Sequence, residues 1–233
     1  MNPLLFLFVP TVCMLIGGVT AIVYLPGERL TVASQHFAAG VVFAAVAKEL
    51  LPQVGAAHAP LALVIGFTLG IAVMLLAKWF SHRLEDQQRG GKLALGLVSA
   101  VLIDVFIDGM LIGVAFLAGE KGGVLITIAL AIEILFLGLS TTATLNQLGA
   151  NKLYRIAVIM LLALVIPFSA YLGEHVFAHA SPGMMNGILA FGVAALLYLV
   201  TEELLVEAHK TEEKIWMPLF FFIGFLLILM LEN

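Results

Sequence analysis

The sequence predicts an all-α, polytopic membrane protein in which eight transmembrane helices form one bundle. Of its 233 residues, 62% are apolar and only 11% are charged, and the mean hydropathy is +1.13. About a quarter of the residues in a soluble domain are charged, so this chain has too few charges to cover a water-exposed surface. We therefore expect residues 1–233 to form a single transmembrane domain with the lipid bilayer as its surroundings.

Successive apolar stretches predict the individual helices. A spanning helix needs about 20 predominantly apolar residues. Such stretches occur at residues 3–25, 31–51, 59–80, 93–118, 122–146, 153–173, 184–207 and 214–231. Residues typical of turns separate them, for example Gly122-Gly123 and Ser181-Pro182-Gly183. The connections are short, which favours one compact bundle.

Lysine and arginine are unevenly distributed between the two sides of this eight-helix arrangement. The connections after the first, third, fifth and seventh helices hold Arg29, Lys78, Arg83, Arg89, Lys92, Lys152, Arg155, Lys210 and Lys214. The other side, which includes both termini, holds only Lys121. Because basic residues accumulate on the cytoplasmic side, we expect both termini outside, in a bacterial inner membrane.

Three acidic residues lie deep within the predicted helices, Asp104 and Asp108 in the fourth and Glu133 in the fifth. An ionised group in hydrocarbon costs about 2.5–3.5 kcal/mol on insertion scales, so these residues should face the bundle interior. Asp104 and Glu133 each lie about 16 Å into antiparallel helices, at 1.5 Å per residue, and so reach the bilayer midplane. Asp108 shares the helix face of Asp104, four residues away.

Three carboxylates at close quarters require a cation or protons to neutralise them. The sequence therefore predicts a cation site at the midplane, although neutral, hydrogen-bonded acids that lock the helices together are the alternative. Glu202 and Glu203, near the cytoplasmic end of the seventh helix, are either further cation ligands or solvated interfacial charges. Lys48, inside the second helix, would be a counter-ion if it lies near the site.

Other classes of function lack their motifs. The sequence has no Gly-rich phosphate loop, no nucleophile elbow and no basic patch for nucleic acid. An intramembrane aspartyl protease would carry its two aspartates on different helices, whereas Asp104 and Asp108 share one. We therefore expect neither an enzyme nor a resident cofactor, and no nucleic-acid partner.

A short internal repeat links the second and seventh helices. Residues 47–53, with the sequence AKELLPQ, echo residues 201–207, with the sequence TEELLVE. The two helices are predicted to run in opposite directions, and inverted repeats place a transporter's substrate site between the halves at the midplane. The pattern suggests an inverted repeat around the carboxylates of the fourth and fifth helices.

Four local motifs resemble the ZIP (Zrt/Irt-like) family of metal transporters. The fourth helix, from Asp104 through Asp108-Gly109 to Gly113, is similar to the family's His-Asn/Ser-x-x-Asp/Glu-Gly pattern. The fifth helix, with Ala-Ile before Glu133 and Gly138-Leu after it, lines up with Ala-Ile-His-Asn/Glu-x-Pro-Glu-Gly-Leu. The ends of the second and seventh helices resemble the family's Leu-Leu-Pro-Glu and Glu-Leu-x-Pro-Glu-x-His segments.

The resemblance implies a transporter for a divalent metal cation of the zinc, iron or manganese class. The cation would enter from outside, bind Asp104, Asp108 and Glu133, and leave past Glu202, Glu203 and His209. A homodimer with a second copy of the chain is a further partner that this interpretation allows.

The chain departs from the family pattern at the metal ligands. Asp104 and Glu133 stand where the family has histidines, and Val105, Ile134, Leu137 and Ile166 replace other polar ligands. An all-carboxylate site suits harder ions such as manganese, magnesium or ferrous iron, although zinc also accepts carboxylates. Two alternatives remain: a ZIP fold that couples protons to another solute without metals, and a non-transporting membrane sensor or assembly subunit.

Overall fold

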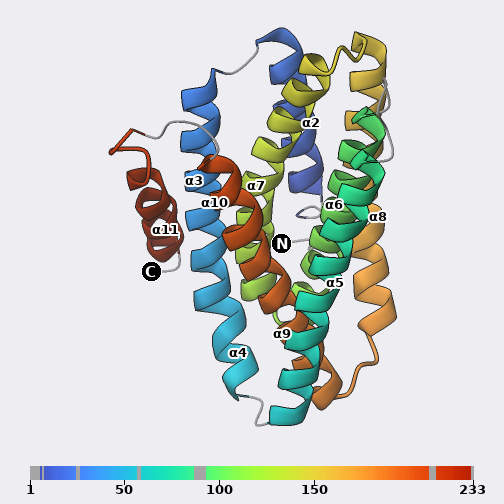
Figure 1. Cartoon of the computed structure of the whole chain (residues 1–233). Coiled ribbons are helices and arrows are strands. Elements are labelled where there is room, and N and C mark those ends of the chain that lie inside the picture. The colour runs from blue at the N-terminus through green and yellow to red at the C-terminus, as the bar shows by residue number, and fades with distance from the viewer. Residues whose placement is uncertain are drawn as a thin grey trace.

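The computed structural model describes residues 6, 8–24, 27–56, 59–86, 93–209 and 214–231. These residues form helices and turns, without a strand in the described ranges. The helices are α2 (Phe8–Val23), α3 (Glu28–Ala45), η1 (Val46–Leu50), α4 (Leu51–Ala56), α5 (Pro60–Asp86), α6 (Leu93–Ala118), α7 (Glu120–Gln147), α8 (Lys152–Phe177), α9 (Pro182–Tyr198), η2 (Leu199–Leu204), α10 (Leu205–Ala208) and α11 (Leu219–Leu231). They pack side by side as one bundle (Figure 1).

Six helices in the described part of the chain are long and apolar enough to cross a membrane. The all-helical, membrane-spanning character predicted from composition is therefore confirmed. Each predicted range overlaps a helix, but α2 and α11 have 16 and 13 residues, fewer than the ~20 of a full span. Helix length alone thus supports six spans and leaves the eight-span count a prediction. Residues 3–5, 7 and 25 of the first predicted range lie outside the described residues.

The helix ends follow local chemistry. Asn151 caps α8, where its Oδ1 accepts the N–H of Tyr154 at 2.7 Å. Ser181 caps α9 in the same way, with Pro182 in the first helical position. Gly149, at φ 77°, adopts the left-handed conformation that ends α7.

Some predicted boundaries were wrong. The second helix was predicted to break at Pro52, but α4 continues through Pro52 to Ala56. The preceding turn is a π-helix, in which the Leu51 N–H bonds to the Val46 carbonyl, and this wider turn accommodates the proline ring. The last helix was predicted from residue 214, whereas residues 215–218 form a turn and α11 begins after Pro218.

Four helix pairs pack most closely: α2 with α7, α6 with α8, α5 with α9, and α3 with α11. Glycine lies at the contact in each pair, because a Cβ there would collide with the partner backbone. The examples are Gly17 against Leu135, Gly113 against Ala170, Gly66 against Gly187, and Gly40 against Phe221. Small residues of this kind are the usual means of close helix packing in membranes.

The two segments that echo each other in the sequence share a backbone irregularity. Residues 46–50 form η1 and residues 199–204 form η2, and both are π-helical. Each continues without a break from α3 or α9 into α4 or α10, so that each rod carries one wide turn in its last third. Such turns are rare and frequently lie at functional sites.

Candidate functional site: a buried carboxylate cluster and its cavity

Asp104, Asp108 and Glu133 lie together at the contact between α6 and α7. Each offers one carboxylate oxygen, and these three oxygens lie within 4.8 Å of one another. Asp104 and Asp108 are one turn apart on the inward face of α6, and Glu133 comes from the middle of α7. The structure thus brings together the three acids that the sequence placed at one depth. We call them the carboxylate cluster.

The cluster is buried and short of hydrogen-bond donors. Asp108 and Glu133 are each 1% exposed. Asp108 Oδ2 and both carboxylate oxygens of Glu133 have no hydrogen-bond partner among the described residues. A buried acceptor without a donor costs about 1–3 kcal/mol, and more when it is charged. The cluster is therefore an arrangement that a bound cation or protons would stabilise.

Close packing behind the cluster fixes Asp108. A Cβ on the next residue, Gly109, would lie 1.9 Å from Ser169 Oγ and 2.7 Å from the Ile166 carbonyl oxygen of α8. Ser169 donates its hydroxyl to the Val165 and Ile166 carbonyls at 2.9 and 3.1 Å. Its hydroxyl is therefore held within its own helix, and α8 continues through Pro167.

A cavity of about 580 Å³ extends from the cluster. Asp104 and Glu133 line it, together with residues of α3, α5, η2 and α10. The lining residues lie within residues 31–35 of α3, 97–107 of α6 and 133–144 of α7. The starts of α3 and α6 and the end of α7 lie in the upper part of the bundle in Figure 1.

Arg29 lies in the first turn of α3, Lys152 and Arg155 lie in the first turn of α8, and Arg83 lies in the last turn of α5. These helix ends also lie in the upper part of the bundle in Figure 1. Of the other lysines and arginines predicted for the cytoplasmic side, Arg89, Lys92 and Lys210 lie outside the described residues.

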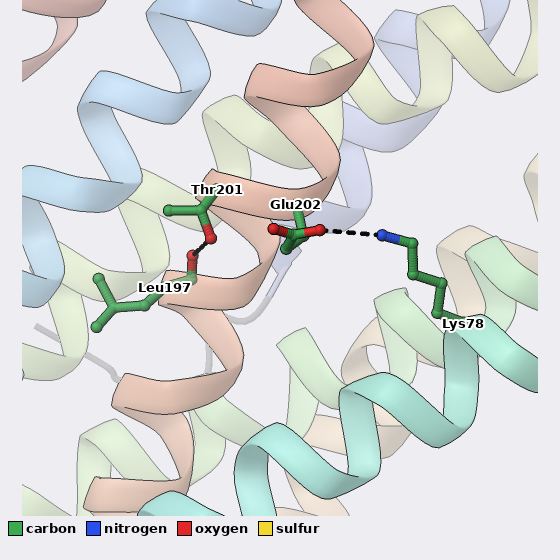
Figure 2. Close-up of polar contacts among 4 residues, drawn as sticks. All are labelled: Lys78, Leu197, Thr201 and Glu202. Atoms are coloured by element: carbon green, nitrogen blue, oxygen red, sulfur yellow. Dashed lines mark hydrogen bonds and ion pairs between the residues drawn. The ribbon is translucent and has the colours of Figure 1, made fainter.

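Glu202 and Glu203 also line the cavity. They therefore share it with Asp104 and Glu133 of the carboxylate cluster, although the sequence places the two groups on helices that are far apart in the chain. Both belong to the π-helical segment η2. The side chain of Glu202 is half exposed, and its Oε2 lies 3.2 Å from Lys78 Nζ of α5 (Figure 2). Thr201, next to it, donates its hydroxyl to the Leu197 carbonyl at 2.9 Å and so is satisfied within its own helix (Figure 2).

Lys78 is a site residue that sequence reasoning missed. The charge pattern assigns it to the connection after the third helix, but it lies within α5 and its side chain lines the cavity. Its position inside the predicted range 59–80 was the available signal. Lys48, the expected counter-ion, is exposed instead and does not line the cavity.

A polar stripe on α7 was also missed. Ser140, Thr141 and Thr144 line the cavity beyond Glu133. Residues 133, 140 and 144 follow the i, i+7, i+11 spacing of one helix face, which could have been found in an otherwise apolar helix. His209, expected further along the path, lies after α10 with its ring 5.6 Å from that of His36, outside the cavity lining.

The chemistry of the donor set is that of hard cations. The cluster offers carboxylate oxygens alone, without histidine or cysteine among the grouped ligands in the described chain. Oxygen ligands suit magnesium, manganese and calcium, whereas imidazole and thiolate favour zinc and copper.

No family model matches the chain, and a comparison with curated proteins finds no match either.

Proposed function

We propose that the chain is a ZIP-like transporter that moves a divalent metal cation across the membrane through the carboxylate cluster. One observation carries the proposal: three acids from two helices converge in the bundle interior, and three of their buried oxygens lack a donor. A transported cation would supply the missing charge. The cavity provides a path between the cluster and one end of the bundle.

The donor set favours manganese or ferrous iron within the zinc, iron and manganese class of substrates. Carboxylate ligands bind zinc as well, so the preference is one of degree. The cation would enter from outside, bind Asp104, Asp108 and Glu133, and leave past Glu202 and Glu203. No catalytic role and no resident cofactor are part of this proposal.

Eight spans and an inverted repeat complete the proposed architecture, with both termini outside a bacterial inner membrane. The helix pairing supports the repeat. In such a repeat, α2 corresponds to α8, α3 to α9, α5 to α11, and α6 to α7. The α2–α7 contact then corresponds to the α8–α6 contact. The α3–α11 contact then corresponds to α9–α5, so the four closest pairs form two matched sets. The positions of η1 and η2 fit the same correspondence. A homodimer is compatible with this architecture.

Metal uptake tests the proposal. The full chain is reconstituted in proteoliposomes, and Mn²⁺ influx is compared between the wild-type protein and Asp108→Ala. We expect the substitution to abolish influx. Glu120→Gln is the matched control, because Glu120 begins α7, is exposed and does not line the cavity, so its influx should equal wild type. Unchanged Mn²⁺ flux in Asp108→Ala would sink the proposal.

A metal-free function is the second candidate, since protons also neutralise buried carboxylates. The unpartnered Glu133 oxygens favour it as much as they favour a metal. In this case the chain would couple protons to another solute, and calorimetry would detect no Mn²⁺, Fe²⁺ or Zn²⁺ binding. Proteoliposomes with the wild-type protein would take up protons without metal, and those with Asp108→Ala would not. This result would support proton coupling in place of metal transport.

A further inference from the structure

Lys78 introduces a positive charge into an otherwise acidic cavity. Four acidic side chains line the cavity, namely Asp104, Glu133, Glu202 and Glu203. Lys78 is the basic residue among the lining residues that the structure describes. A cavity that passes cations thus carries a cation of its own.

Two groups of one helical rod hold the Lys78 ammonium. Nζ lies 3.2 Å from Glu202 Oε2 and 5.5 Å from the centroid of the Tyr198 ring. Residues 198 and 202 are one turn apart, so the carboxylate and the aromatic face are presented on the same side. A carboxylate and an aromatic face both attract cations, and together they define a cation position.

The cation position at Glu202 and Tyr198 lies close enough to the carboxylate cluster for their charges to interact. Glu203, next to Glu202, lies within electrostatic range of Lys78 and of Asp104, Asp108 and Glu133. Glu133, whose buried oxygens lack a donor, lines the cavity that Glu202 and Glu203 also line. Without the Lys78 charge, Glu202 and Glu203 would be two neighbouring carboxylates with no basic side chain among the described residues that line the cavity.

We propose that Lys78 is a specificity-determining residue of the cavity. Its ammonium pairs with the Glu202 carboxylate and acts as a cation that is covalently attached to the chain. The cavity therefore binds one divalent ion, at the carboxylate cluster, and not two. Removal of the charge opens a second divalent-cation position at Glu202 and Glu203. The inference rests on the proposed metal-binding function and adds its stoichiometry.

The test is the number of Mn²⁺ ions bound by the full chain in detergent, measured by calorimetry and by the electron paramagnetic resonance of the bound ions. We expect one ion per wild-type chain and two per Lys78→Met chain, with spectra broadened by the nearby pair. Lys78→Arg keeps the charge and should bind one. The double variant Lys78→Met/Glu202→Gln lacks the new position and should also bind one.

Arg83→Met is the matched control for loss of a positive charge. Arg83 lies on the same helix, stacks on Trp79 with its guanidinium 4.7 Å from the ring centroid, and does not line the cavity. It should bind one Mn²⁺. Lys78→Gln is measured alongside, so that a folding defect in Lys78→Met does not decide the result.

The possible results separate this inference from the proposed function. One ion in both the wild type and the two uncharged Lys78 variants overturns the role of Lys78 and leaves the cluster as a metal site. Two ions in the wild type also overturn it. One ion in Lys78→Met and none in the wild type supports the role of Lys78 but contradicts metal binding at the cluster. No Mn²⁺ in either protein overturns both.

Discussion

The carboxylate cluster and the Lys78–Glu202 pair are two ways of placing acids inside one bundle. In the cluster, Asp108 and Glu133 are 1% exposed and three oxygens lack a donor. In the pair, the Lys78 and Glu202 side chains are 37% and 50% exposed, and each charge has its partner at 3.2 Å. Asp104 and Glu133 of the cluster line the same cavity as the pair. Of the two groups, the cluster is the one whose buried oxygens have no partner among the described residues.

The difference separates function from stability. An exposed ion pair contributes about 0–1 kcal/mol, because water screens it and both side chains lose conformational freedom. Buried acids without a counter-charge destabilise the folded chain. Clustered buried acids of this kind are typical of a site that binds a ligand or a proton. Substitutions at Glu133, Gly109 and Asp108 test this contrast, from the largest expected effect to the smallest.

Glu133→Gln should lower Mn²⁺ affinity by more than ~100-fold. Loss of an outer partner of a metal site typically costs about 10–100-fold, and Glu133 is a direct ligand candidate with both oxygens free to bind. Isothermal titration of the purified chain measures the change. Glu202→Gln should change the affinity by less than ~10-fold, and an equal loss in the two variants would contradict the contrast.

Gly109→Ala should destabilise the chain by about 1–3 kcal/mol and lower Mn²⁺ affinity about 10-fold. The added methyl group would collide with Ser169 and the Ile166 carbonyl, which forces α6 from α8 and displaces Asp108. Thermal unfolding and calorimetry measure the two effects. Gly55→Ala is the control, because a Cβ at Gly55 meets nothing within 4 Å. A Gly109→Ala protein with wild-type affinity would show that this packing does not position the cluster.

Asp108→Asn should raise the metal-free stability by about 1–2 kcal/mol. The amide removes one of three like charges and donates a hydrogen bond to a neighbouring carboxylate. Thermal unfolding in a chelator measures the gain, which should disappear when Mn²⁺ is added, because only the wild type is stabilised by bound metal. Glu202→Gln should change metal-free stability by less than ~1 kcal/mol. A stability loss in Asp108→Asn would instead assign the cluster a structural role.

Much of the fold and the cluster could be predicted because their causes are local. Residues such as Asn151 and Ser181 cap the helices that follow them, so the starts of α8 and α9 could be predicted to within a few residues. The depth of Asp104 and Glu133 follows from the constant rise of an α-helix, and their meeting needs only two adjacent antiparallel helices.

The rest depends on contacts that a single helix does not encode. Lys78 and Glu202 meet because α5 packs along α9, which continues into η2, and α5 is far from both segments in the chain. The π-helical turns leave no periodic signal, since one extra residue interrupts the 3.6-residue pattern instead of repeating it. The sequence echo marked both turns without revealing their geometry.

The glycine-packed pairs also bear on the order of folding. None of the four pairs joins helices that follow each other in the chain. The partner of α3 is α11, which is synthesised last of the described helices. Helices insert into the membrane one after another and then associate. Closure of such distant contacts is entropically slow. We therefore expect the first helices to remain unpaired in the bilayer until α7 and α11 have been synthesised, so that the bundle closes late and at its C-terminal helix.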